Sequence, residues 1–221
     1  RMEQVGDTTL SEGQRFPAPR TRFAATWAGV EDRHSSYLPG ARDNVVCYIH
    51  GGIDANGHVL GDMWRGERLR APNPYWYWVW KRVLPNSAAT ARFGHTMSFD
   101  PGPHPPSAND AQFARLVIFG GRLADSSLAN NHIYTYGVGK SGTQADSGAW
   151  RETTVPAESV QVGVPEAREG HAAAVRSTVA GDDDKERQIF FFGGARADSS
   201  LVDAGLWYLS RPDLAAGDTA L

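Results

Sequence analysis

The apolar residues of the chain are gathered in short runs, which clusters of Gly, Pro, Asp and Ser separate. Several of these runs are continuous, such as "LVIF" at 116–119 and "IFFF" at 189–192. A continuous run of about four to eight apolar residues is typical of a β-strand that is covered on both faces. No helical period of roughly 3.6 residues competes with this pattern. The pattern therefore predicts an all-β chain of short strands in stacked sheets.

Three of the apolar runs end in a Gly pair, and the pairs recur about every 70 residues. We expect each pair to form a tight turn with positive φ, where a Cβ atom would clash. The pairs are Gly51-Gly52, Gly120-Gly121 and Gly193-Gly194.

A second sequence motif, or marker, precedes each Gly pair at a similar distance along the chain. The marker reads "RFAAT" from Arg22, "RFGHT" from Arg92 and "REGHA" from Arg168. After each Gly pair come a polar loop and an aromatic strand, and the first two copies then contain Trp80 and Trp150. Each copy therefore predicts four short antiparallel strands, with small residues such as Ala172 to Ala174 on an inner strand and the Trp residues on outer strands.

The coincident markers resemble the kelch repeat family, whose signature runs Arg-x-Gly-His, apolar strand, Gly-Gly, aromatic strand, Trp. The resemblance covers Arg22 to about Leu209 and implies a kelch-type β-propeller with about three four-stranded blades. The blades would be 20–90, 91–165 and an incomplete 166–221, preceded by an N-terminal segment, 1–19, that is a linker or a closing strand.

The chain departs from the kelch signature in two places. Ala24-Ala25 stand where Gly-His is expected, and the third copy stops after "LWYLSRPDL" without a Trp strand. For Arg92, His95, Arg168 and His171, which match the signature, the resemblance implies a structural role. Closed propellers have roughly four to eight blades, so we expect the chain to be part of a larger propeller. The missing blades would come from a longer protein, which we favour, or from a second chain.

The string "ADSSL" occurs after the second and the third Gly pair. In one interpretation, Asp125 and Asp198 form turns by accepting hydrogen bonds from amides two residues on, and Leu128 and Leu201 pack between blades. In the other, the two loops are equivalent contacts for a partner on one face of the protein. The partner-binding residues would then be Arg122, Asp125, Ser126, Arg196, Asp198 and Ser199.

The charge balance and the single cysteine limit the functional classes. The chain has 22 basic and 25 acidic residues, which argues against direct nucleic-acid binding. No apolar stretch approaches the roughly 20 residues of a membrane span, so no membrane contact is expected. Cys47 excludes an intrachain disulfide and lies in an apolar run as a small hydrophobe, and no Asn-x-Ser/Thr site occurs. We therefore expect an intracellular, cytoplasmic protein.

No motif in the chain indicates catalysis, a metal or a cofactor. The seven His residues lack the close spacing of a sequence-local zinc site. "GKSG" at 139–142 lacks the rest of a phosphate loop and is expected to be a turn, and the acidic run at 182–184 is expected to be a solvated hairpin tip.

The favoured function is a scaffold or adaptor that binds a protein or peptide partner through its propeller loops. Fold alone does not establish this, because kelch-like propellers include sugar oxidases and mutarotases. A sugar-directed enzyme therefore stays an alternative. A further resemblance, to the propeller of the recombination-activating protein 2 family, rests on "RFAAT", "YIHGG", "RFGH" and "VIFGGR". It implies a regulatory subunit of a DNA recombinase.

Overall fold

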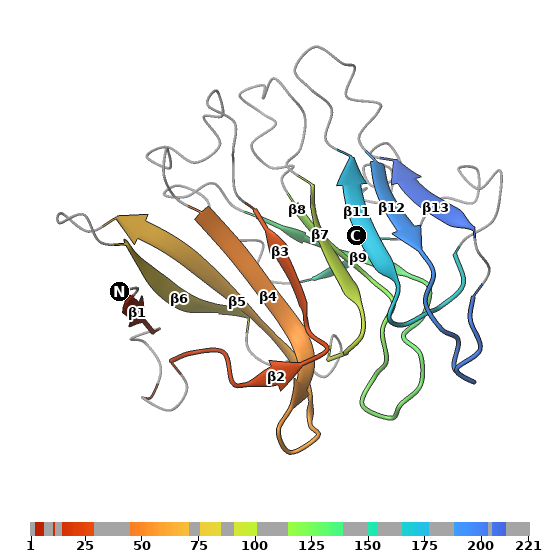
Figure 1. Ribbon diagram of the computed structural model, residues 1–221, viewed down its shortest axis with the longest axis horizontal. Helices are drawn as coiled ribbons and strands as arrows, with labels where there is room; N and C mark the ends of the chain where they lie inside the picture. The colour runs from red at the N-terminus through yellow and green to blue at the C-terminus, as the bar shows by residue number, and fades with distance from the viewer. Residues whose placement is uncertain are drawn as a thin grey trace, which may run out of the picture.

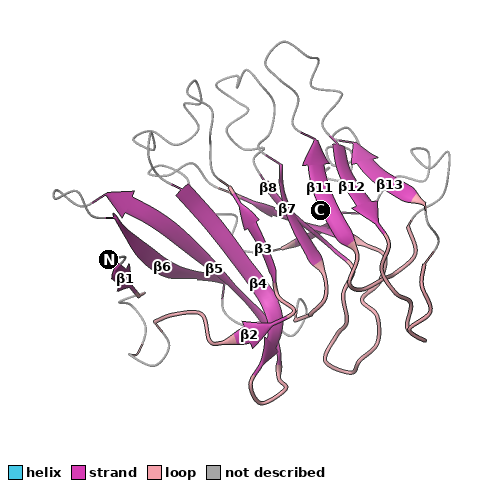
Figure 2. Cartoon of the chain, in the orientation of Figure 1, coloured by secondary structure: helices cyan, strands magenta, loops and turns pink. Residues whose placement is uncertain are grey.

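The computed structural model describes residues 3–6, 11, 15–28, 45–70, 76–84, 91–100, 115–138, 150–153, 165–176, 188–202 and 205–210. Across these ranges the regular structure consists of β-strands alone (Figures 1 and 2). The described part contains no helix that is long and apolar enough to cross a bilayer. The chain is thus all-β, as the short apolar runs predict.

The first sheet has six strands in the order β1-β6-β5-β4-β2, and β3 also pairs with β4. Its pairings are antiparallel except for β1 with β6, which run parallel. The N-terminal segment therefore adds an edge strand to this sheet. The strands are β1 (Glu3–Val5), β2 (Arg20–Thr21), β3 (Ala24–Trp27), β4 (Val45–Asp54), β5 (Val59–Arg70) and β6 (Trp76–Leu84).

The second and third sheets are antiparallel and follow chain order. The second has the order β10-β9-β8-β7, and the third has the order β11-β12-β13. In the described part of the chain the second sheet has the four strands expected of a repeat, the first sheet has six, and the third has three, in line with its missing Trp strand. The strands are β7 (Thr96–Asp100), β8 (Arg115–Phe119), β9 (Ile133–Gly137), β10 (Arg151–Thr153), β11 (Ala172–Arg176), β12 (Gln188–Phe192) and β13 (Leu206–Ser210).

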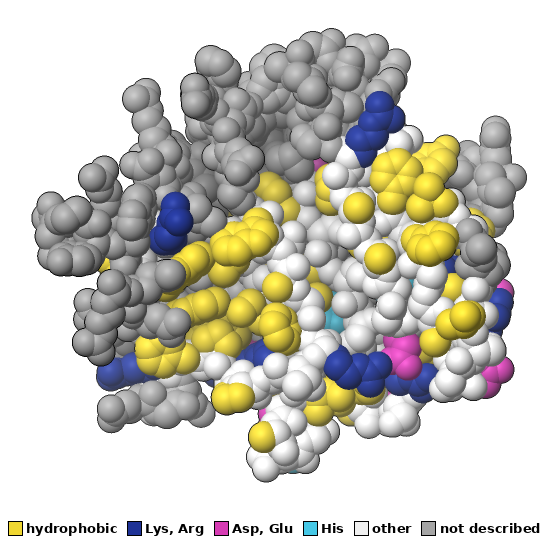
Figure 3. Space-filling view, in the orientation of Figure 1, with side chains coloured by type: hydrophobic (Ala, Val, Ile, Leu, Met, Phe, Trp, Pro, Cys, Tyr) yellow, Lys and Arg dark blue, Asp and Glu magenta, His cyan; other side chains and the backbone are white. Residues whose placement is uncertain are grey.

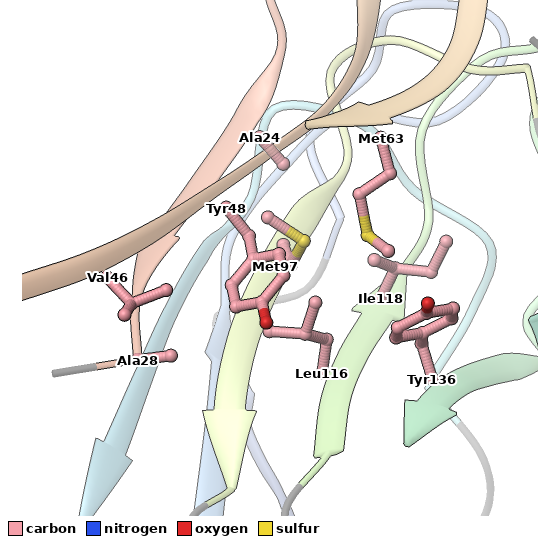
Figure 4. Close-up of a cluster of buried hydrophobic side chains, with 9 residues drawn as sticks. All are labelled: Ala24, Ala28, Val46, Tyr48, Met63, Met97, Leu116, Ile118 and Tyr136. Carbon is pink, nitrogen blue, oxygen red and sulfur yellow. The ribbon is translucent and has the colours of Figure 1, made fainter. Parts of the chain in front are cut away.

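The strand β8 is covered on both faces, which explains its continuous apolar sequence. Leu116 and Ile118 belong to a core cluster shared with the first sheet (Figure 4). Val117 and Phe119 point the other way, into a cluster shared with the third sheet. Burying each such side chain contributes roughly 1.5–3 kcal/mol, so β8 holds the three sheets together.

The strand β12 has an equally apolar sequence but is covered on one face. Ile189 and Phe191 pack into the cluster shared with the second sheet. Phe192 lies at the end of the strand with 51% of its surface exposed. The prediction that "IFFF" is covered on both faces is therefore wrong at Phe192, because no described residue packs over that side of the third sheet.

The first two Gly pairs each connect their sheet to the next one. All six glycines have positive φ, as in Gly51 at 65° and Gly120 at 68°. The Gly52 amide donates to the Arg92 carbonyl at 2.9 Å, and the Gly121 amide donates to the Arg168 carbonyl at 2.8 Å. The same hydrogen bond thus joins the first sheet to the second and the second to the third.

One Arg side chain in each sheet donates a hydrogen bond to a carbonyl of the Gly turn, and these contacts show which Arg residues are equivalent between the repeats. Nη1 of Arg92 donates to the Gly120 carbonyl at 3.2 Å, and Nη1 of Arg168 donates to Gly193 at 3.0 Å. In the first sheet Arg20, not Arg22, makes this contact, with Nη1 at 3.1 Å from the Gly51 carbonyl. The predicted equivalence of Arg22 with Arg92 is therefore wrong by two residues.

Arg22 instead takes the place of the glycine in the Arg-x-Gly-His marker. Its φ is 53°, close to the 66° of Gly94 and the 63° of Gly170. The Gly94 amide donates to the Arg22 carbonyl at 2.9 Å, and the Gly170 amide donates to the Gly94 carbonyl at 2.8 Å. This main-chain relay runs through all three sheets. Phe23 then occupies the place of His95 and His171.

Candidate functional site

The first "ADSSL" segment forms a tight hairpin turn after β8. The Leu123 amide donates to the Ser127 carbonyl at 2.9 Å, and the Ser126 amide donates to the Leu123 carbonyl at 3.0 Å. Ser126 has a φ of 66°, the left-handed conformation that ends a three-residue hairpin loop. Oδ1 of Asp125 accepts from the Ser127 amide at 2.9 Å and from its hydroxyl at 2.5 Å.

The second "ADSSL" segment repeats this turn after β12. The Arg196 amide donates to the Ser200 carbonyl at 2.8 Å, and the φ of Ser199 is 65°. Oδ1 of Asp198 accepts from the Ser200 amide at 2.9 Å and from its hydroxyl at 2.6 Å. Both carboxylates therefore make the turn contacts that the first interpretation expects, with the amides two residues on.

The tips of both turns are exposed to solvent at the lower edge of the view (Figure 1). The Ser127 hydroxyl and then its amide lower the pKa of Asp125, and Ser200 does the same for Asp198. Both carboxylates are therefore ionised at neutral pH. Charged side chains of both signs gather along this edge (Figure 3). Leu201 is 79% exposed, so it does not pack between the sheets as the turn interpretation expects.

Arg122 links the two turns by hydrogen bonds to main-chain carbonyls of both. Its Nη1 donates to the Ser126 carbonyl at 2.8 Å within its own turn. Its Nη2 reaches the Arg196 carbonyl at 3.3 Å and the Ala197 carbonyl at 3.2 Å in the next turn. Only 15% of the Arg122 side chain is exposed, so its guanidinium is committed to holding one turn beside the other.

Arg196 is also engaged within the protein. Its Nε donates to Oε2 of Glu166 at 2.8 Å, and its Nη1 donates to the Leu201 carbonyl at 2.5 Å. The structure therefore brings all six predicted contact residues to one edge, but it exposes only four of them freely. The four that lie in the exposed tips are Asp125, Ser126, Asp198 and Ser199.

Glu169 joins all three sheets at this edge, a role that the sequence did not indicate. Its Oε1 accepts from Nε of Arg122 at 2.5 Å, and its Oε2 pairs with Arg22 of the first sheet. The Arg22 guanidinium also lies 4.5 Å from the centroid of the Phe93 ring. Only the acidic residue inside "REGH" could have pointed to this cluster, because its partners lie far away along the chain.

Two buried His residues form a pair between the first and second sheets. Nδ1 of His50 lies 3.0 Å from Nε2 of His95, with the rings edge to face. Burial, with Arg92 adding to it, lowers the pKa of His50 to about 3, and burial with His50 beside it holds the pKa of His95 well below its usual value. Both rings are therefore neutral, and they serve the junction between the sheets.

His171 occupies the matching place between the second and third sheets. Its Nε2 lies 2.8 Å from Oγ1 of Thr96, and its ring packs edge to face on Phe119. Burial, with a smaller effect of Arg168, lowers its pKa to about 4. His171 is thus neutral as well, inside the second junction.

A buried ion pair beneath the first Gly turn was also missed by sequence reasoning. Nη1 and Nη2 of Arg20 donate to the two Asp62 oxygens at 2.6 and 2.9 Å, and Nε1 of Trp64 donates to Asp62 at 2.6 Å. Burial opposes ionisation of Asp62, but Arg20 outweighs it and holds the pKa of the carboxyl below its usual range. The pair orients Arg20 toward the Gly51 carbonyl.

The two predicted structural Trp residues lie near the outer edges of their sheets, but β1 flanks the strand of Trp80 and Trp150 lies just outside a strand. Trp80 is in β6, where its ring borders Gly66 beside Cys47, and Trp150 directly precedes β10. The Trp150 ring lies 5.2 Å from His50 and 5.4 Å from Tyr136. Cys47 is half-buried, and burial raises the pKa of its thiol.

Among the described residues, no group of three or more His, Cys, Asp or Glu side chains could hold a metal ion. The predicted turn at 139–142 and the acidic run at 182–184 lie outside the described ranges, as do His34 and His104. No protein-family model matches the chain, and no curated protein sequence matches it significantly.

Proposed function

We propose that this chain is part of a kelch-type β-propeller that binds a protein or peptide partner through the two "ADSSL" turns. The observation that carries the proposal is the pairing of these turns. They have the same geometry, lie at one edge and are braced together by Arg122. The junction contacts that recur from sheet to sheet support the propeller architecture.

The chemistry of the turn tips favours a partner segment with positive charge or hydrogen-bond donors. The exposed tips carry the ionised carboxylates of Asp125 and Asp198 and the Ser126 and Ser199 side chains. The neighbouring guanidiniums of Arg122 and Arg196 are directed to carbonyls and carboxylates of the protein itself. The charged groups that remain available to a partner at this edge are thus the two carboxylates. Lys or Arg side chains of a partner would complement their negative charge.

The combined change Asp125→Asn and Asp198→Asn tests the proposal. Asn retains the carbonyl oxygen that accepts the turn hydrogen bonds, so the turns stay closed while their charge is lost. Asp54→Asn is the matched control, because Oδ1 of Asp54 closes the corresponding turn of the first sheet by accepting from Asn56 and His58.

The experiment is proximity labelling in cells with the full chain, followed by titration of the purified partner. We expect the double variant to lose the partner with an unchanged melting temperature, and the control to retain it. Retention of the same partner by the double variant would overturn the proposal. The enzyme and recombinase alternatives are not carried forward, because no contact among the described residues favours either.

A further inference from the structure

Each junction between sheets has two halves. The leading sheet contributes the ring before its Gly pair and the amide of its second glycine. The following sheet contributes the residue at the His position of its marker and a main-chain carbonyl of Arg. In the second junction, Phe119 packs on His171 with ring centroids 5.2 Å apart, and the Gly121 amide donates to Arg168. Phe119 is thereby left only 1% exposed.

The third sheet has the leading half of a junction but no following sheet in the described structure. Phe192, which corresponds to Phe119, is 51% exposed, and its neighbours Leu206 and Tyr208 are 62% and 61% exposed. The Gly194 amide donates to no residue of the described part, unlike the amides of Gly52 and Gly121. A Cβ atom at Gly193 would meet nothing within 4 Å.

The first sheet has the following half of a junction, but no leading sheet stands before it among the described residues. Phe23 stands in the His position, since Gly52 approaches its Cβ as Gly121 approaches the Cβ of His95. Phe23 is 42% exposed and Trp27 is 60% exposed. The Trp27 ring packs against the Trp78 ring, with the ring centroids 6.0 Å apart. Hydrophobic side chains gather over the first and the third sheets in the same view (Figure 3).

We propose that a second copy of this chain, rather than the further blades of a longer protein that the repeat pattern favours, covers the third sheet with its first sheet. The two open faces are both apolar, and together they supply the two halves of a junction that the chain already makes twice. Phe192 would pack on Phe23 of the second copy, and the Gly194 amide would donate to its Arg20 carbonyl. Exposed apolar faces of this kind mark association surfaces.

If the third sheet of each copy packs on the first sheet of the other copy, the two copies close into a ring. Both junctions of the ring are then identical, so a two-fold axis relates the copies, and none of the three described sheets keeps an open face. The inference rests on the repeated architecture of the proposed propeller, but it does not depend on whether the "ADSSL" turns bind a partner.

Mass in solution provides the first test. A chain of 24.0 kDa should sediment or scatter at twice this mass. Phe192→Asp and Phe23→Asp should each halve the observed mass, while Phe16→Asp should leave it unchanged. Phe16 is a suitable control because its ring is 40% exposed and borders Gly6. A monomer at every concentration, or a dimer that survives both face variants, would overturn the proposal.

Cross-linking tests the pairing of the two faces directly. Chains with Phe23→Cys and chains with Phe192→Cys, both in a Cys47→Ala background, are mixed and treated with a short bismaleimide. We expect a covalent dimer from the mixture but none when Phe16→Cys replaces Phe23→Cys. Equal cross-linking of both mixtures, or of neither, would overturn the proposal. The Asp125→Asn and Asp198→Asn variant should stay dimeric, so failure of the turn proposal and failure of this one are distinguishable.

Discussion

The second and third sheets share nearly the same sequence around their Gly pairs, but they differ in what surrounds them. "VIFGGRLADSSL" and "FFFGGARADSSL" both form a strand, a positive-φ Gly pair and the same braced turn. In β8 the side chains alternate between two core clusters, whereas in β12 one face packs on the second sheet and Phe192 stays half exposed. The comparison separates what a local sequence determines, which is conformation, from what its neighbours determine, which is burial.

The Gly pairs offer the sharpest contrast between the two sheets. In Gly120→Val the new Cβ would collide with the main-chain oxygen of Arg168 and lie 2.8 Å from His171, whereas in Gly193→Val it would meet no atom. Both residues have a φ of 68°, so both variants share the backbone strain. We expect a loss of about 4 kcal/mol for the first and about 1–2 kcal/mol for the second. Denaturant unfolding with the chain dilute enough to be monomeric measures both, and equal losses would contradict the open third face.

The rings before the Gly pairs provide the second contrast. Phe119→Ala removes a ring that is 1% exposed, and Phe192→Ala removes one that is 51% exposed. We expect the first to cost about 3–4 kcal/mol and the second less than about 1 kcal/mol, measured by denaturant unfolding with the chain dilute enough to be monomeric. A similar cost for both would mean that β12 is covered within a single chain.

The neutral His residues in the junctions predict a loss of stability in mild acid. Because burial lowers the folded pKa of His171 from 6.5 to about 4, the unfolded chain binds more protons between these values. Stability should therefore fall as the pH drops below about 6.5, by up to about 1.4 kcal/mol per pH unit for each such His. His171→Gln should make the slope of unfolding free energy against pH shallower. An unchanged slope would show that folding does not lower the pKa of His171.

We expect the smallest change in stability from substitutions in the two turns, and we expect the same change in both sheets. Ser126 and Ser199 hold left-handed φ values of 66° and 65°, where the corresponding residue of the first sheet is Gly57 with a φ of 83°. Ser126→Gly and Ser199→Gly should each stabilise the protein by about 0.5 kcal/mol, because the relief of strain slightly exceeds the entropy cost of glycine. Calorimetric melting would detect this, and a loss of stability in either variant would argue against the strain.

The strands, the Gly turns and the geometry of the repeated loops could be predicted because each follows from neighbours in sequence. The hydrogen bond from Ser127 to Asp125 is an example, since it spans two residues. The uncovered side of Phe192 could not be predicted, because an apolar run does not indicate how many sheets surround it. The brace from Arg122 to Glu169 was equally out of reach, since 47 residues separate the two.

The first repeat shows how matching letters can mislead. "RF" at Arg22 and Phe23 matches "RF" at Arg92 and Phe93, yet the geometry aligns Arg22 with Gly94. What the fold requires is an Arg whose guanidinium reaches the first glycine of the turn, and Arg20 meets that requirement with Asp62 to orient it. A requirement of this kind is spatial, and the spacing of residues along the chain does not reveal it.

The relay from Gly170 to Gly94 to Arg22 has a consequence for the order in which the chain gains structure. Most pairings in each sheet join strands that are consecutive in the chain, so closing their loops costs less entropy than a contact between distant sheets does. The relay joins residues more than 70 positions apart, so it can form only once whole sheets have docked. The exchange rates of the Gly94 and Gly170 amides with solvent deuterium therefore report the docking of sheets, whereas amides within a hairpin report its own opening.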